Sequence, residues 1–228
     1  MTAAVLFDLD GTLLDHEGAA AEAITWSFPD ADPAWLVPRW KELGEESFAR
    51  YLAGELSFTA QRRVRITTLT RELGLGDWDD ARADAWFVGF LAAYERAWRP
   101  FPEVKRVLEK LSERGLPLGV ITNGDAAQQR RKIERTGLAG LLPHVVASSE
   151  AGAAKPSPGI FRTACAVLGV EPPTATYVGD RLADDAEAAA AAGLTGVWLD
   201  RSGAPPPNGL DVARITTLDA LPALIDTA

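Results

Sequence analysis

Five short runs of uninterrupted apolar residues constrain the fold of this chain more than any other feature. A strand with one wet face alternates apolar and polar residues, whereas these runs do not alternate and fit strands buried on both faces. Helical patterns lie between most of the runs, and strands that alternate with helices predict an α/β fold built on a parallel sheet. The runs are Ala3–Leu9, Leu118–Thr122, His144–Ala147, Thr176–Gly179 and Gly196–Leu199.

Capping residues predict where several of the helices begin and end. Asp125 can cap a helix that ends at Gly137, and Ser157 can cap one that continues to Leu168. The alanine-rich stretch Ala183–Ala192 stands between a strand and a glycine, so we expect a short helix there. A last strand and a short helix are expected near the C-terminus, after the proline-rich loop Ala204–Gly209.

The interval between the first two runs is too long for one connecting helix. A strand–helix–strand unit needs about 30 residues, whereas Asp10 to Pro117 is more than three times that length. The surplus carries only helical signals, so we expect a core of residues 1–14 and 100–228 with an inserted α-helical domain of residues 15–99. Six of the seven tryptophans fall in the insert, where we expect them to fill a thin core; that one or two of them line a substrate pocket is the alternative. They are Trp26, Trp35, Trp40, Trp78, Trp86 and Trp98.

Composition excludes several classes of partner. The 228 residues include 23 Lys and Arg against 32 Asp and Glu, a net charge of −9, and this charge repels nucleic acid and anionic membranes. Cys165 is the one cysteine, so no disulfide can form within the chain. The start does not resemble a signal peptide, and no apolar stretch of about 18 residues could span a bilayer. We therefore expect a cytoplasmic protein.

Two carboxylates follow each other closely at the end of the first run. Residues alternate between the faces of a strand, so Asp8 and Asp10 are expected on the same face. At 4 Å and an effective dielectric constant of 20 their repulsion is about 4 kcal/mol, which a shared proton or a cation must offset. A calcium-binding EF-hand loop is excluded, because its sixth and twelfth positions are Leu13 and Ala19 here instead of Gly and Glu.

Polar residues also follow two later strands. Thr122 and Asn123 end the second run, and Asp180 follows the fourth, with Asp184 and Asp185 just beyond. Ligands of open parallel sheets bind at the carboxyl ends of the strands, so these groups are expected to converge.

Lys155 precedes the helix that Ser157 caps. A helix N-terminus carries about half a positive charge, so a lysine there is slightly unfavourable unless an anion lies between them. Helix N-termini favour phosphate, and Lys155 is therefore a candidate phosphate-binding residue.

The ordered motifs resemble those of the haloacid dehalogenase superfamily, and the helical insert resembles the type 1 cap of that superfamily. This resemblance implies a Rossmann-like, doubly wound parallel sheet with an inserted α-helical cap that sets substrate specificity. It also implies a Mg²⁺-dependent phosphatase that acts on a small phosphorylated metabolite through an aspartyl-phosphate, as a monomer or homodimer. The motifs are Asp8-Leu9-Asp10-Gly11-Thr12, Thr122-Asn123, Lys155-Pro156 and Gly179-Asp180 with Asp184-Asp185.

The resemblance assigns a role to each catalytic residue. Asp8 is the expected nucleophile, and Asp10 is the expected acid that protonates the leaving oxygen and then activates water. Thr122 and Asn123 are expected to bind the phosphoryl oxygens, and Lys155 to hold both Asp8 and the phosphate.

The same resemblance implies a site for Mg²⁺, a cation that prefers oxygen ligands. The expected ligands are the carboxylates of Asp8 and Asp180 and the backbone carbonyl of Asp10. Asp185 is the expected supporting carboxylate, and its neighbour Asp184 stays an alternative.

Other activities of the superfamily stay open or are disfavoured. Its dehalogenases lack the second aspartate, which is present here as Asp10, and its phosphonate hydrolases need a cap lysine in a context that Lys41 does not share. A sugar phosphomutase and a non-catalytic protein that binds a phosphorylated ligand stay as alternatives.

Three arginines stand together in the insert, at positions 62, 63 and 65. One interpretation is a solvated helix face paired with nearby carboxylates. The other is that one of the arginines binds a second anionic group of the substrate, a task that suits the planar guanidinium.

Overall fold

The computed structural model describes residues 2–227. The chain divides into two compact units. Unit 1 is formed by the residues up to Asp15 together with those from Arg99 onward, and unit 2 is formed by His16–Trp98. None of the helices in the described residues is long and apolar enough to cross a membrane.

A six-stranded sheet forms the centre of unit 1. Its strand order is β3-β2-β1-β4-β5-β6, and every neighbouring pair is parallel. The chain builds one half of the sheet outward from β1 and then the other half, which is the doubly wound α/β fold that the sequence predicted. The strands are β1 (Ala4–Phe7), β2 (Leu118–Thr122), β3 (His144–Ala147), β4 (Ala175–Gly179), β5 (Thr195–Leu199) and β6 (Ala213–Ile215).

The first strand is shorter than the apolar run predicted. It ends at Phe7, and Asp8 is the first residue beyond it. Asp10 forms only an isolated bridge with Leu14, where the backbone N–H of Gly11 donates to the Leu14 carbonyl at 2.9 Å. The expectation that Asp8 and Asp10 share one face of a strand was therefore wrong: both lie beyond the end of β1, in the segment before the turn at residues 11–13.

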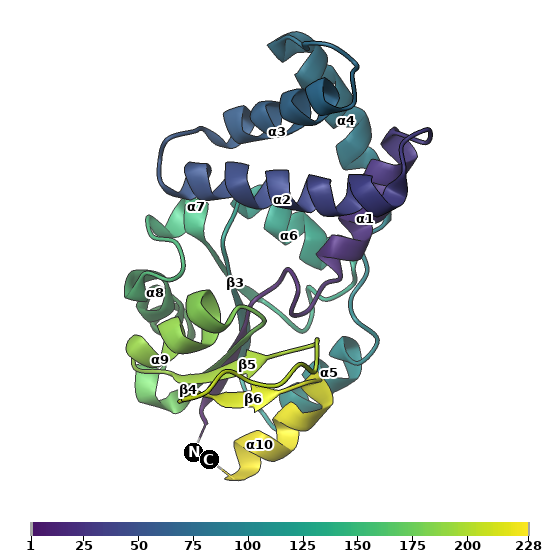
Figure 1. Cartoon of the computed structure of the whole chain (residues 1–228). Helices are drawn as coiled ribbons and strands as arrows, with labels where there is room; N and C mark the ends of the chain where they lie inside the picture. The colour runs from purple at the N-terminus through teal and green to yellow at the C-terminus, as the bar shows by residue number, and fades with distance from the viewer. Residues whose placement is uncertain (1, 228) are drawn as a thin grey trace. The chain divides into compact units, whose positions relative to one another are not determined.

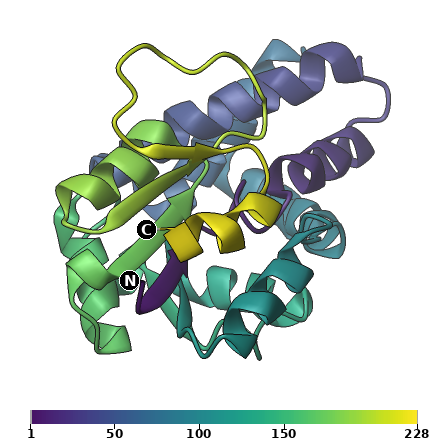
Figure 2. The same ribbon diagram turned by 90° about the horizontal axis from the view of Figure 1, so that it is seen from below.

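Helices cover both faces of this sheet, and alternate residues of each strand face different layers. Val5 and Phe7 pack with the apolar sides of α5 and α10, whereas Leu6, between them in sequence, packs with α8 and α9. Figure 2 shows α8 and α9 in green on one side of the sheet, with teal α5 and yellow α10 on the other. Burial on both faces explains why the strands read as uninterrupted apolar runs.

Two helices of unit 1 begin at the caps that the sequence predicted. The Asp125 carboxylate accepts from the backbone N–H of Gln128, and the Ser157 hydroxyl accepts from that of Gly159. The alanine-rich stretch begins as a π-helical turn, Leu182–Glu187, before its α-helical part. The α-helices are α5 (Val104–Glu113), α6 (Ala126–Arg135), α7 (Ser148–Ala151), α8 (Pro158–Leu168), α9 (Ala188–Ala191) and α10 (Leu221–Thr227). Two short 3₁₀ turns, Pro172–Thr174 and Leu218–Ala220, complete the unit.

Unit 2 contains four α-helices within the described residues (Figure 1). Side-chain caps open three of them, because Asp32, Ser57 and Asp79 each accept a hydrogen bond from a backbone N–H in the first turn of the helix that follows. The helices are α1 (His16–Ser27), α2 (Pro33–Leu52), α3 (Phe58–Glu72) and α4 (Asp80–Arg96).

Aromatic side chains fill the core of unit 2. Trp40 and Trp98 are buried, and Trp78 and Trp86 pack against the same cluster. The Trp40 ring lies edge-on to Phe90, with 5.1 Å between ring centroids, a favourable arrangement of two aromatic rings. The expectation of a core role was wrong for the remaining two tryptophans of the unit, because Trp26 and Trp35 are exposed.

Candidate active site

Three neighbouring strands bring the predicted site residues of unit 1 to one edge of the sheet. Strand β1 pairs with β2 on one side and with β4 on the other. Asp8 follows β1, Thr122 ends β2 and Asp180 follows β4. The order in which the chain adds strands to the sheet reverses between β1 and β4, and the carboxyl ends of the strands at such a switch point form the usual ligand site of an open α/β sheet.

Lys155 links the carboxylates at this edge. Its Nζ donates to Oδ1 of Asp8 at 2.6 Å, to Oδ1 of Asp185 at 2.7 Å and to the Tyr177 hydroxyl at 3.0 Å. The Tyr177 hydroxyl in turn donates to Oδ1 of Asp185 at 2.9 Å. Lys155, Asp8, Tyr177 and Asp185 are all buried, so these charges interact through protein rather than water.

Burial and neighbouring charges change the proton affinities of these groups. Burial raises the pKa of Asp8 well above its ordinary value; Asp185 and Asp180 add to this, and Lys155 opposes it. Burial would lower the pKa of Lys155, but the carboxylates of Asp185 and Asp8 outweigh it and raise that pKa. Burial also raises the pKa of Tyr177 well above its ordinary value, so Tyr177 stays a neutral donor.

Three carboxylates at the site are close enough to share a cation. Oxygen atoms of Asp8, Asp180 and Asp185 all lie within 4.8 Å of one another. Such an all-oxygen set of buried carboxylates fits a hard divalent cation such as Mg²⁺. A cation there would offset the burial and the mutual repulsion that raise the pKa of Asp8 and of Asp180.

Two glycines allow the carboxylates to approach the backbone. A Cβ atom on Gly11 would lie 2.4 Å from Oδ2 of Asp180, and the φ of Gly11 is +92°, a conformation that other residues rarely adopt. A Cβ atom on Gly179 would lie 2.3 Å from Cγ of Asp185. Gly11 and Gly179 are therefore part of what makes room for the site.

The two acidic residues after Asp180 have different surroundings. Asp185 is fully buried, and its Oδ2 accepts from the backbone N–H of Arg181 at 2.9 Å. Asp184 has a side chain that is 40% exposed and pairs with the Arg181 side chain at 3.2 Å. Asp185, not Asp184, thus lies with Asp8 and Asp180.

The phosphate-binding candidates are held in place by specific hydrogen bonds. The Asn123 side chain forms two bonds with the backbone of Lys155: its Nδ2 donates to the Lys155 carbonyl at 2.9 Å, and its Oδ1 accepts from the Lys155 N–H at 2.8 Å. The side chain of Asn123 is therefore engaged in fixing the position of Lys155. The buried Thr122 hydroxyl lies 2.6 Å from Nε2 of Gln129.

Two residues at the site were missed by the sequence analysis, Gln129 and Lys132 of α6. Nζ of Lys132 lies 2.5 Å from Oδ2 of Asp10, and Nε2 of Gln129 donates to the same oxygen at 3.0 Å. Both are buried on the inner side of α6 with Ile133. The available signal was their helical phase, because Gln129 lies four residues before the core residue Ile133 and Lys132 lies three residues after Gln129.

The arginine cluster of unit 2 separates into different environments. Arg63 forms ion pairs with Asp80 and Asp84 at 2.5 Å each. Arg65 donates twice to the Trp40 carbonyl, at 2.7 and 3.1 Å, and its guanidinium lies 3.5 Å from the centroid of the Trp40 ring. Arg62 lies over the Phe58 ring at 4.4 Å.

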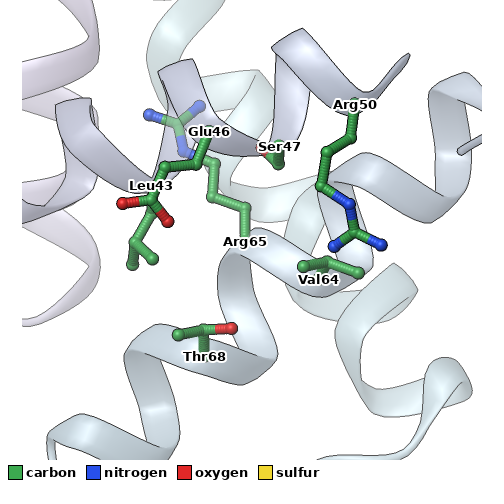
Figure 3. Close-up of a pocket in the computed structure, with 7 residues that line it drawn as sticks. All are labelled: Leu43, Glu46, Ser47, Arg50, Val64, Arg65 and Thr68. Atoms are coloured by element: carbon green, nitrogen blue, oxygen red, sulfur yellow. The ribbon is translucent and has the colours of Figure 1, made fainter. Parts of the chain in front are cut away.

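A small cavity of about 180 Å³ lies between α2 and α3 of unit 2 (Figure 3). Arg65 reaches across it from α3, and Arg50 of α2 lies at its other side. Arg50 pairs with Glu55 at 3.1 Å, and Arg65 is bonded to the Trp40 carbonyl, so both cations serve contacts within the unit.

Comparison with known proteins identifies the family. The model of the haloacid dehalogenase-like hydrolases matches residues 2–193. The chain belongs to this family of hydrolases, as its four motifs predicted.

Its curated relatives include phosphatases, in agreement with the predicted branch. A glyceraldehyde 3-phosphate phosphatase from Methanopyrus kandleri is 35% identical over 202 residues, which are 88% of this chain and 85% of the relative. A ribulose-1,5-bisphosphate 5-phosphatase from Halopiger xanaduensis is 33% identical over 215 residues, 89% of this chain and 86% of the relative.

Solved structures share the fold along almost the whole chain. The magnesium-bound HAD-hydrolase YfnB from Bacillus subtilis matches with a TM-score of 0.84 at 20% identity, covering 99% of both chains. Solved 2-haloacid dehalogenases have the same fold, so the fold does not by itself choose between removal of phosphate and removal of halide.

Proposed function

We propose that this protein is a Mg²⁺-dependent phosphatase that removes phosphate from a small phosphorylated metabolite through an aspartyl-phosphate intermediate. The observation that carries the proposal is the pair of carboxylates after β1: Asp8 in contact with Lys155, and Asp10 two residues on. A dehalogenase needs only the nucleophile, whereas phosphate-ester hydrolysis needs a second group that can give a proton to the leaving oxygen. The phosphatases among the curated relatives support the same choice.

In the first half-reaction an oxygen of Asp8 attacks phosphorus, and the bond from phosphorus to the ester oxygen breaks. Asp10 gives its proton to the departing alkoxide, which leaves as an alcohol. In the second half-reaction Asp10 takes a proton from water, and the water oxygen attacks the phosphorus of the aspartyl-phosphate. Inorganic phosphate is released, Asp8 regains its carboxylate and Asp10 regains its proton, so the protein returns to its starting state. The reaction is thereby divided into two displacements, each easier than a single one.

Lys155 and the hydroxyl of Thr122 would hold the phosphoryl oxygens during both steps, and fixed donors of this kind stabilise the charge of the transition state. Asn123 would act through the two bonds that hold the backbone of Lys155. Tyr177 keeps Lys155 in place by accepting from its Nζ.

The carboxylates of Asp8 and Asp180, with the Asp10 carbonyl, would hold Mg²⁺, and Asp185 would support it. When bound, the cation supplies positive charge that screens Asp8 from the incoming phosphate and neutralises charge on the phosphoryl oxygens. Asp185 also forms a direct bond with Lys155, so its carboxylate serves the metal site and the lysine together.

Unit 2 would select the leaving group, as a cap that sets substrate specificity. The substrates named for the two phosphatase relatives are small sugar-derived phosphates, so compounds of that class are the first to test. A sugar phosphomutase would use the same residues of unit 1, and only the product separates it from a phosphatase.

The experiment is a measurement of inorganic phosphate released from a panel of triose, pentose, hexose and amino-acid phosphates with Mg²⁺. We expect stoichiometric release of phosphate and alcohol from at least one of them. Conversion of a sugar phosphate to its isomer, without phosphate release, would identify a phosphomutase instead. Absence of any turnover, together with binding of a phosphorylated ligand, would leave the non-catalytic alternative.

A further inference from the structure

We infer that Lys132 is a positioning residue for the phosphatase reaction: it holds the carboxylate of Asp10 in the orientation needed for proton transfer. This inference rests on the proposed function and adds a residue to it that the four motifs do not contain. It is carried by the contact between Nζ of Lys132 and Oδ2 of Asp10, at 2.5 Å.

Helix α6 brings two donors to the same oxygen of Asp10. Lys132 and Gln129 are one helical turn apart, and both donate to Oδ2 of Asp10, at 2.5 and 3.0 Å. Two donors on one oxygen fix the rotation of a carboxylate more tightly than either alone. The N-terminus of α6 is itself fixed by its cap, the carboxylate of Asp125.

The burial of Lys132 argues against a purely structural role. The side chain is 4% exposed, and burying an ammonium costs several kcal/mol unless it is paired. Two of its neighbours on the inner side of the helix, Ala126 and Ile133, are apolar, so an apolar side chain at position 132 would serve packing against them at lower cost. The contact with Asp10, a residue that the proposed reaction requires, explains why a lysine is buried at position 132.

The distribution of charge at the site also supports a role for Lys132 at Asp10. Four carboxylates converge near the end of β1, namely Asp8, Asp10, Asp180 and Asp185, and Lys155 offsets one of them. Lys132 lies against a second, Asp10, so each of these two acidic groups has a lysine beside it. The two lysines contact different catalytic candidates: Lys155 contacts Asp8, and Lys132 contacts Asp10.

A group that must transfer a proton loses efficiency when it is misplaced by about 1 Å, with losses of up to about 100-fold. We therefore expect Lys132→Met to lower kcat by about 10- to 100-fold and to change KM by less than about threefold. The loss should be larger for an alkyl phosphate than for p-nitrophenyl phosphate, because p-nitrophenolate leaves without help from an acid.

The decisive experiment is a double-mutant cycle with Asp10→Asn. If Lys132 acts through Asp10, then Lys132→Met in the Asp10→Asn background should change kcat by less than about threefold. Lys105→Met is the matched control, since it removes one positive charge from an exposed position of α5 and should leave kcat and KM at the wild-type values. Thermal unfolding checks that each variant is folded, and Lys132→Gln replaces Lys132→Met in the cycle if the latter does not fold.

Three results would overturn the inference: wild-type kcat for Lys132→Met with the alkyl substrate, an equal loss in both backgrounds, or a rise in KM alone. The last would make Lys132 a phosphate-binding residue. In all three cases the proposed function is unaffected, provided that the wild type and Lys105→Met release phosphate. A wild-type protein that hydrolyses no phosphate ester would instead refute the proposed function, and the inference with it.

Discussion

Each unit of this protein contains a cation with little access to water, and the two cations are held in opposite ways. Lys155 of unit 1 is held by two carboxylates and a hydroxyl, which raise its pKa. Arg65 of unit 2 is held by the Trp40 carbonyl and the Trp40 ring, and burial lowers its pKa to about 9. Among the described residues no carboxylate lies within 4.0 Å of Arg65.

The difference fits the catalytic role that we propose for Lys155 and a packing role for Arg65. The partners of Lys155 carry more negative charge than one lysine can neutralise, and this excess is useful only if a second cation binds. The partners of Arg65 are neutral and join α3 to α2, which stabilises the helical unit without creating a site. The comparison therefore assigns the chemistry to unit 1, and the following predictions test it from the largest expected effect to the smallest.

Replacing the nucleophile should have the largest effect. Asp8→Asn removes the attacking oxygen's charge, so we expect kcat to fall at least about 10⁴-fold. Asn has nearly the shape of Asp, and Asp185 still pairs with Lys155, so the thermal midpoint should not fall. The measurement is steady-state phosphate release together with thermal unfolding. A kcat within tenfold of the wild type in the folded variant would remove Asp8 from this role.

Removing divalent cations should abolish turnover and also lower stability. Chelation should reduce kcat by at least about 10³-fold, and Mg²⁺ should restore it. Binding to the folded state alone stabilises it by about 2.7 kcal/mol at 100 times the dissociation constant, so Mg²⁺ should raise the thermal midpoint. Asp180→Asn is the control that should lose most of this shift. Full activity after exhaustive chelation would contradict the proposed metal site.

Exchanging each cation for methionine tests the comparison directly. Lys155→Met leaves Asp8 and Asp185 close together without a counter-charge, and we expect kcat to fall by about 10² to 10³-fold. Arg65→Met should leave kcat/KM within about twofold but destabilise the protein by about 1–3 kcal/mol, through lost hydrogen bonds and stacking. Urea unfolding and steady-state kinetics measure both. The comparison fails if Arg65→Met loses activity while keeping its stability.

The arginine cluster of unit 2 should give the smallest effect. Arg63 pairs with Asp80 and Asp84, Arg65 donates to the Trp40 carbonyl, and Arg62 lies over the Phe58 ring. We use Arg62 to test the interpretation that an arginine of the cluster binds an anionic group of the substrate. Arg62→Ala should then raise KM by about 5- to 150-fold, which corresponds to 1–3 kcal/mol for a bond between charged groups. Arg63→Ala is the matched control and should leave KM unchanged. Equal KM values for the two variants would exclude this role for Arg62.

Much of unit 1 could be predicted from the sequence because its strands are buried on both faces and its site residues follow them directly. Asp8, Thr122 and Asp180 each stand at a strand end, so the parallel order of the sheet was enough to bring them together. The choice between Asp184 and Asp185 could not be made in the same way. It depends on the π-helical turn that buries Asp185 and leaves Asp184 exposed, and this turn has no signal in the composition of the stretch.

The residues that the sequence analysis missed lie within helices rather than at strand ends. Gln129 and Lys132 stand in a helix rich in polar residues, where a lysine is usually exposed. Only their helical spacing of three and four residues from Ala126 and Ile133 or from each other marks their side of α6 as buried. In unit 2 it was likewise not possible to tell buried from exposed positions within a helix. The number of aromatic residues predicted a core, but it did not show that Trp26 and Trp35 would be exposed.

The place where unit 2 is inserted has a consequence for how the protein is synthesised. The chain leaves unit 1 at Asp15 and returns at Arg99. The backbone N–H of Asp15 donates a hydrogen bond to the Arg99 carbonyl at 3.1 Å, and the two side chains form an ion pair at 3.0 Å. Strand β1 leaves the ribosome first, yet its partner β4 is made more than 160 residues later. Unit 2 is complete well before that, because it is one continuous segment, His16–Trp98, and helical units of this kind fold quickly. We expect the helical unit to fold first on the ribosome, while strand β1, which precedes Asp8, waits for the rest of its sheet.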